Sequence, residues 1–131
     1  MIIYLDIDGV LLANDKQKAN FSKDFIKSMV ENHDVYWLTT HCKGDASFAI
    51  ELLSRYFDSE TIEYVRKIKP TNWETWKTDA VDFSKDFLWF DDQVFEEEIK
   101  VLKENNKFDS WVQIDLSKNP DQLKDFLSLR D

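Results

Sequence analysis

Four short runs of apolar, β-favouring residues alternate along the chain with segments whose apolar residues recur at helical spacing. The runs occupy residues 2–5 (IIYL), 35–38 (VYWL), 87–90 (FLWF) and 111–114 (WVQI). Continuous apolar runs of this length are typical of strands that are buried on both faces of a sheet. Strands that alternate with helices predict a parallel sheet covered on both sides, which is a three-layer α/β/α, Rossmann-like fold.

The segments between these runs carry the predicted helices. We expect helices to begin near Ser22, after Gly44, near Thr71 (where Glu74 gives capping-box spacing), near Gln93, and at Asn119 followed by Pro120. Residues 61–68 (TIEYVRKI) are rich in β-branched side chains and predict a short edge strand. Helical spacing turns Phe48 and Phe95 inward, and the acidic run 96–98 is interpreted as a solvated helix face.

Polar, chemically capable side chains follow three of the four strands at the point where each strand ends. Asp6 and Asp8 follow the first, residues 39–40 (TT) the second, and residues 91–92 (DD) the third. In open parallel sheets, ligands bind in the crevice at the carboxyl ends of the strands. One such strand end is expected by chance in an α/β domain, whereas three indicate a functional site.

The opening stretch Asp6-Ile7-Asp8-Gly9 places two carboxylates close together. Side chains alternate along a strand, so Asp6 and Asp8 point the same way if the strand geometry continues through Ile7. Such a pair repels itself unless a cation or a proton-transfer role offsets the repulsion. Taken alone, the motif is equally well explained as a solvated loop, and Gly9 as a turn residue.

Composition sets the bounds of function. The 131 residues are 43% hydrophobic and suit a single domain, residues 1–131, with one core. The net charge of −9 argues against extended nucleic-acid binding, which usually requires a basic face. Cys42 is the only cysteine, which excludes an internal disulfide and a cysteine-based zinc site. No signal peptide and no long apolar run are visible, so we expect a cytoplasmic monomer without membrane contact.

The converging groups suit phosphoryl chemistry assisted by Mg²⁺. Carboxylate and carbonyl oxygens are the hard ligands that Mg²⁺ prefers, and a carboxylate beside the metal can attack phosphorus. Lys77 would offset charge on the phosphoryl group, and Thr39 would donate a hydrogen bond to it. Several alternatives stay open: Thr40 for Thr39, Lys67 or Lys69 for Lys77, and a helix N-cap role for Asp92.

The order of these motifs resembles the haloacid dehalogenase (HAD) superfamily of phosphohydrolases. The resemblance covers residues 1–92 and is carried by residues 6–10 (DIDGV), residues 36–39 (YWLT), Lys77 and residues 88–92 (LWFDD). It implies that Asp6 is the nucleophile and that Asp8 is the general acid and then the general base.

The same resemblance implies that Mg²⁺ is held by Asp6, the backbone carbonyl of Asp8, and one or both of Asp91 and Asp92. The carboxylate at position 8 resembles the motif of the phosphatase and phosphotransferase members, whereas the dehalogenases lack it. It also implies a HAD-like domain without a cap, because neither residues 9–34 nor residues 40–77 have room for a cap domain. An open site of this kind suits phosphorylated substrates with a large body.

The predicted function is therefore that of a Mg²⁺-dependent phosphatase, which hydrolyses a phosphomonoester through an aspartyl-phosphate. Two alternatives are a receiver-like signalling domain and a catalytically idle binding module on the same fold. Receiver domains take their phosphate on an aspartate after a central strand of the sequence, whereas here the paired aspartates follow the first. His41 follows the second strand and is interpreted as an ordinary loop residue.

Overall fold

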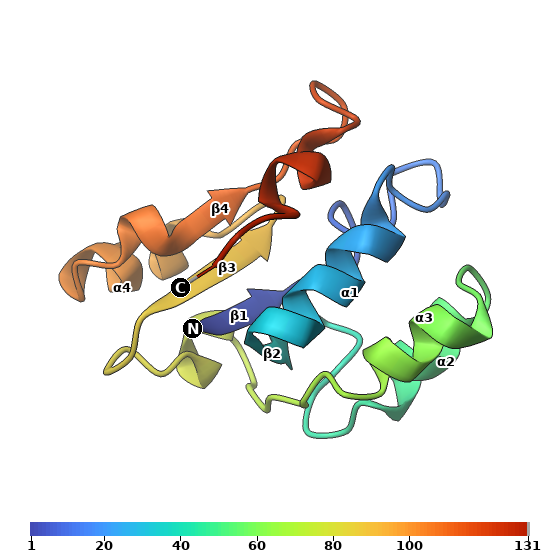
Figure 1. Ribbon diagram of the computed structural model, residues 1–131. Coiled ribbons are helices and arrows are strands. Elements are labelled where there is room, and N and C mark those ends of the chain that lie inside the picture. Colours follow the sequence, from blue (N-terminus) through green and yellow to red (C-terminus); the bar gives the residue numbers. More distant parts are fainter. Residues whose placement is uncertain (131) are drawn as a thin grey trace.

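A four-stranded parallel sheet forms the centre of the computed structural model, which describes residues 1–130 (Figure 1). The strands are β1 (Ile2–Leu5), β2 (Asp34–Trp37), β3 (Phe87–Asp91) and β4 (Trp111–Gln113), and they lie in the order β2-β1-β3-β4. Every pair of neighbouring strands is parallel. The predicted α/β class, with the first strand between the second and the third, is confirmed.

Helices cover both faces of this sheet and complete three layers (Figure 1). One face is covered by α1 (Ser22–Asn32), α2 (Ser47–Ser54), α3 (Ser59–Val65) and the 3₁₀-helix η3 (Gln122–Phe126). The other face carries α4 (Glu96–Glu104) and two 3₁₀-helices, η1 (Lys77–Ala80) and η2 (Phe108–Ser110). The strands are mostly apolar because their side chains enter a core on each face.

The two cores divide the side chains of the strands as the pleat requires. Ile3 and Leu5 of β1 belong to the core under α1 and α3, whereas Tyr4 belongs to the core under α4. Trp37 and Trp89 are among the largest fully buried side chains. This packing holds β1 and β3 side by side, and it therefore fixes the position of the residues that follow them.

The edge strand predicted for residues 61–68 is wrong, because this stretch lies largely in α3. Asp58 is the N-cap of that helix, and its Oδ1 accepts the Thr61 N–H at 2.8 Å. Ile62 and Val65 are buried, and α3 packs against α1 and α2. The cap and the apolar stripe together outweigh the β-propensity of the branched side chains.

The helix predicted from Thr71 is also wrong. Residues 72–76 are irregular, and regular structure begins only with the short η1. Trp73 is buried in the core under α4, whereas Trp76, which a helix would place on the same face, is only partly buried. The later helices start downstream of their predicted positions, α4 at Glu96 and η3 at Gln122.

Three inward or outward assignments are corrected by the structure. Phe48 and Phe95, expected in the core, are 70% and 58% exposed. Glu98, expected on a solvated face, is buried. Within residues 1–130, no helix has the length and apolarity needed to cross a membrane.

Candidate active site

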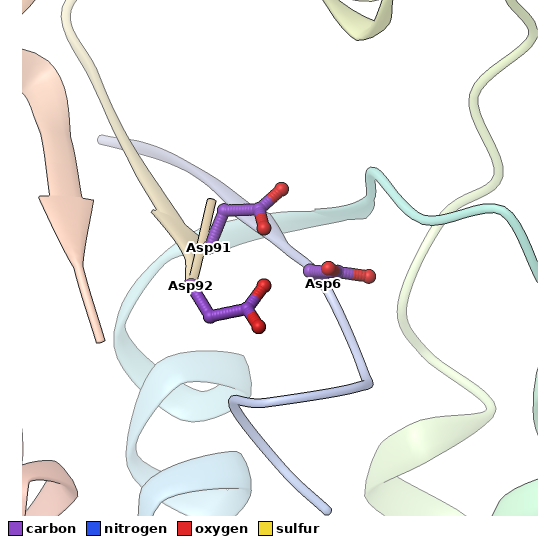
Figure 2. Close-up of side chains that lie close together, drawn as sticks. All are labelled: Asp6, Asp91 and Asp92. Carbon is purple, nitrogen blue, oxygen red and sulfur yellow. The ribbon is translucent and has the colours of Figure 1, made fainter. Parts of the chain in front are cut away.

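Three carboxylates meet at the carboxyl ends of β1 and β3. Asp6 directly follows β1, Asp91 is the last residue of β3, and Asp92 comes next. The register pairs Leu5 with Phe90, so the next residues of the two strands are neighbours. One carboxylate oxygen from each aspartate lies within 4.8 Å of the other two (Figure 2). The predicted convergence of these strand ends is confirmed.

The three aspartates differ in their exposure to solvent. Asp6 and Asp91 are buried, whereas Asp92 is exposed. Asp6 Oδ1 accepts the Ile7 N–H at 2.8 Å, and Asp91 Oδ1 accepts the Gln93 N–H at 3.2 Å. The helix N-cap interpretation of Asp92 is wrong, because α4 begins at Glu96 and its N-cap is Phe95. Asp92 is therefore free of that structural duty.

Lys77 lies between the two buried carboxylates. Its Nζ is 2.7 Å from Asp91 Oδ2 and 3.3 Å from Asp6 Oδ2, and only 13% of its side chain is exposed. The competing lysines lie elsewhere. Lys69 pairs with Asp34 at 2.6 Å, and Lys67 lies over the ring of Tyr64. Of the three lysines that the sequence left open, Lys77 is the one that the fold brings to the aspartates.

The buried group of Lys77, Asp6 and Asp91 has a net charge of one negative unit when all three side chains are ionised. Burial, and then the nearby Asp6 carboxylate, raise the pKa of Asp91 to about 8, although Lys77 acts in the opposite direction. Burial lowers the pKa of Lys77, but Asp6 and Asp91 outweigh it and the net shift is upward. A protonated lysine beside a carboxylate that resists ionisation indicates a need for a proton or a cation.

Glu98 binds two backbone N–H groups, one at Lys77 and one at Phe95. Its Oε2 accepts the Lys77 N–H at 2.8 Å, and its Oε1 accepts the Phe95 N–H at 3.0 Å. One buried carboxylate therefore joins the start of η1 to the start of α4. Sequence reasoning missed this role, although a glutamate three residues after a helix N-cap is the signal of a capping box.

Gly9 gives the Asp92 carboxylate its space. The φ angle of Gly9 is +80°, which side chains other than glycine rarely adopt. A Cβ atom at this position would collide with the carboxylate of Asp92. The glycine is therefore required for the close approach of the loop to Asp92, as well as for its own turn.

Asp8 lies outside the three-carboxylate group and contacts His41 instead. His41 Nε2 is 2.8 Å from Asp8 Oδ2, and about half of the Asp8 side chain is exposed. The sequence interpretation of His41 as an ordinary loop residue missed this contact. No spacing rule could have found it, because the two residues belong to different loops. A metal contact through the Asp8 backbone carbonyl stays a prediction.

The two threonines after β2 have opposite environments. Thr39 is fully buried, and its Oγ1 accepts the His41 N–H at 3.3 Å. Thr40 is exposed on the loop that follows. Both residues follow the carboxyl end of β2, where the sequence predicted a phosphate contact. Their phosphate-binding roles stay predictions.

The donor set of the aspartate cluster fits Mg²⁺ better than zinc. It offers carboxylate oxygens from Asp6, Asp91 and Asp92 and contains no histidine or cysteine among the described residues. Comparison with protein-family models, with curated proteins and with solved structures returned no match. The function of this protein is therefore inferred from the site itself.

Proposed function

We propose that this protein is a Mg²⁺-dependent phosphatase that hydrolyses a phosphomonoester through an aspartyl-phosphate on Asp6. The observation that carries this proposal is the buried Lys77, held between Asp6 and Asp91 with Asp92 within reach. The single positive charge of Lys77 balances only one of the two ionised carboxylates, so negative charge is left over, and a divalent cation would balance it. An arrangement of this kind suits the binding of a phosphoryl group.

In the first step, an oxygen of Asp6 attacks phosphorus and the bond from phosphorus to the leaving oxygen breaks. Asp8 transfers its proton to that leaving oxygen, so a neutral alcohol departs. In the second step, a water oxygen attacks the aspartyl-phosphate and Asp8 takes the proton of the water. The bond from phosphorus to Asp6 then breaks, which releases inorganic phosphate and restores both carboxyl groups to their starting states.

The contact of His41 supports different roles for Asp6, the nucleophile, and Asp8, the general acid and base. This contact uses one carboxylate oxygen of Asp8, Oδ2, and leaves Oδ1 for proton transfer. Lys77 serves the phosphoryl group instead, because its ammonium group lies against Asp6. The nucleophile and the acid thus have separate partners.

Asp6, Asp91 and Asp92 are the residues that would hold Mg²⁺, with the backbone carbonyl of Asp8 as a further ligand. When bound, the metal would neutralise charge on the phosphoryl oxygens and orient the phosphorus toward Asp6. Glu98 and Gly9 contribute indirectly, since Glu98 fixes the backbone of Lys77 and Gly9 makes room for Asp92.

The same proposal includes a cytoplasmic, monomeric protein that acts on a phosphorylated substrate with a large body. The segments that join the strands in residues 1–130 contain α1, α2, α3, η1, α4 and η2, which pack on the sheet and its helices. Asp92 is exposed, and half of the Asp8 side chain is exposed.

Hydrolysis of 4-nitrophenyl phosphate tests this function. The purified protein should release nitrophenol with Mg²⁺, and exhaustive EDTA treatment should abolish the release. Asp6→Asn, which keeps the size of the side chain but removes the nucleophile, should be inactive. Full activity after chelation would contradict the metal, and no turnover at any metal concentration would favour the receiver-like or idle alternatives.

A further inference from the structure

A shallow hollow lies beside the proposed general acid. It has a volume of about 420 Å³ and is lined by Thr40, His41, Lys43, Asp45 and Phe48. His41 connects it to the chemistry, because the same side chain that lines the hollow contacts Asp8 at 2.8 Å. His41 is therefore the residue that links the hollow to Asp8.

The charged side chains of the hollow already have partners within the protein. Lys43 Nζ donates to the Glu74 carbonyl oxygen at 3.1 Å and lies 4.2 Å from the centroid of the Trp73 ring. Asp45 Oδ1 accepts the Ser47 N–H at 2.9 Å. Lys43 and Asp45 also carry opposite charges, so together they give the hollow no net charge with which to select a charged ligand.

Phe48 is the large apolar side chain among the residues that line the hollow. It is 70% exposed at the start of α2, and within residues 1–130 its ring makes no aromatic or cation–π contact. An exposed ring presents a flat apolar face, and the partner that uses such a face best is another planar ring.

We propose that this hollow is the leaving-group subsite and that it selects phosphomonoesters whose leaving group carries an uncharged aromatic ring. The proposal rests on the proposed function, because it takes Asp8 as the acid that protonates the leaving oxygen. An oxygen held at Asp8 places the rest of the leaving group next to His41. A ring one or two carbons further on then reaches Phe48 and stacks on it.

Three alkyl phosphates with leaving groups of similar acidity separate ring recognition from chemistry. They are 2-phenylethyl phosphate, n-butyl phosphate and 2-cyclohexylethyl phosphate, the last of which is apolar but not planar. The wild-type protein should prefer the phenyl compound over both others by about three- to tenfold in kcat/KM, the range that one aromatic pair supplies.

Variants of two exposed phenylalanines locate that preference. Phe48→Ala should reduce the ratio of the phenyl to the butyl compound to near one, and Phe48→Tyr should keep it. Phe95→Ala is the matched control, since Phe95 is also exposed (58%) but lies at the start of α4, outside the hollow. It should leave the ratio unchanged. Circular dichroism establishes that each variant is folded.

The outcomes distinguish this inference from the function on which it rests. Hydrolysis of acetyl phosphate, which has no ring, reports whether the wild-type protein is a phosphatase at all. If acetyl phosphate is hydrolysed but the phenyl compound is not preferred, the subsite is refuted and the phosphatase remains. A preference lost in Phe95→Ala instead of Phe48→Ala also refutes it. If nothing is hydrolysed, both proposals fail together.

Discussion

Gly9 links the backbone of the first loop to the position of one proposed metal ligand. We predict that Gly9→Ala weakens Mg²⁺ binding, because the new methyl group displaces the Asp92 carboxylate. It should also lower stability, since a side chain at a φ of +80° costs about 1–2 kcal/mol. Isothermal titration with Mg²⁺ and urea unfolding measure the two effects separately.

Gly44 provides a matched control for this prediction. Its φ of +88° imposes the same backbone strain, but a Cβ there would meet Asn72 only at an ordinary contact distance of 3.6 Å. Gly44→Ala should therefore lower stability by a similar amount and leave Mg²⁺ affinity unchanged. Equal losses of Mg²⁺ affinity in both variants would show that the glycine effect is general strain and not the displacement of Asp92.

His41 should matter in proportion to how much the leaving group needs a proton. His41→Ala removes the contact that holds the Asp8 side chain. General acid–base catalysis supplies a rate increase of roughly 10²–10⁴-fold, and we expect this variant to lose part of that increase with alkyl phosphates. An activated acyl phosphate needs no proton and should be slowed much less. The measurement is the dependence of kcat on leaving-group pKa.

His41→Gln keeps a donor near Asp8 and should recover part of the loss. His33→Ala removes the other histidine of the chain, which lies just before β2 at the opposite end of the strand, and serves as the control. A uniform loss over all leaving groups in His41→Ala would assign His41 to folding or to phosphate binding rather than to Asp8.

At the scale of elements, Glu98 joins the start of η1 to the start of α4 and so helps to position Lys77 at the site. Glu98→Ala leaves the N–H groups of Lys77 and Phe95 without their acceptor, so we expect a loss of about 1–3 kcal/mol in the free energy of unfolding. Urea denaturation measures this loss. Glu97→Ala, at the exposed neighbouring position, should change stability little.

If Glu98 acts only as a cap for α4, the catalytic parameters of the folded Glu98→Ala protein should match those of the wild type. If it also positions Lys77, kcat should fall and Glu98→Gln, which keeps one acceptor oxygen, should recover part of it. Equal stability in Glu98→Ala and Glu97→Ala would contradict the role given to this buried carboxylate.

The cap of α3 makes a pH-dependent contribution to stability. The hydrogen bond from Lys23, and then those from Thr61, hold the pKa of Asp58 well below its usual range. Because the folded-state pKa is depressed, the stabilisation is present above the unfolded pKa of about 3.9 and is lost as pH falls below it. Asp58→Ala should therefore lower Tm clearly at pH 7.

The Tm difference between Asp58→Ala and the wild type should shrink as pH falls from about 5 toward 2. Asp58→Asn is the control, since asparagine keeps the acceptor for the Thr61 N–H but carries no charge for Lys23. Its Tm should lie between the other two at pH 7. A Tm difference that does not vary with pH would mean that the ionised cap contributes nothing.

Much of the fold could be predicted because the strands are continuous apolar runs that are buried on both faces. Once β1 lies between β2 and β3 in parallel, the register brings Asp6 beside Asp91 without further information. The alternation of strands and helices therefore predicted both the sheet and the meeting of its polar ends.

The helical segments were harder to predict because local and tertiary signals compete there. In residues 61–68, the Asp58 cap and the packing of Ile62 against the core outweigh β-propensity. In residues 71–81, burial of Trp73 and the reach of Lys77 to Asp91 prevail over a helical pattern. Neither tertiary demand can be seen in the local sequence.

Contacts between loops could not be predicted at all. Asp8 and His41 are brought together by the conformation of residues 39–42, where the Cys42 N–H donates to the Thr39 carbonyl oxygen. The spacing of residues along the sequence does not predict that turn. The contact of Glu98 with Lys77 could not be predicted for the same reason, because an irregular segment positions Lys77.

At the scale of the whole molecule, the fold gives Asp6 and Asp8 different surroundings and therefore different proposed duties. Asp6 is buried against Lys77, whereas Asp8 is half-exposed against His41. If Asp6 alone bonds to phosphorus, Asp6→Asn should form no phosphoenzyme. Asp8→Asn should still form one with a leaving group that needs no proton, and should hydrolyse it slowly because water is no longer activated.

Acid-quench trapping of radiolabelled phosphate from acetyl phosphate, with Mg²⁺ present, tests this claim most directly. We expect acid-stable, base-labile label to accumulate on Asp8→Asn, to appear transiently on the wild type, and to be absent from Asp6→Asn. Label on Asp6→Asn but not on Asp8→Asn would reverse the two roles. Equal labelling of the wild type and both variants would contradict an aspartyl-phosphate at this site.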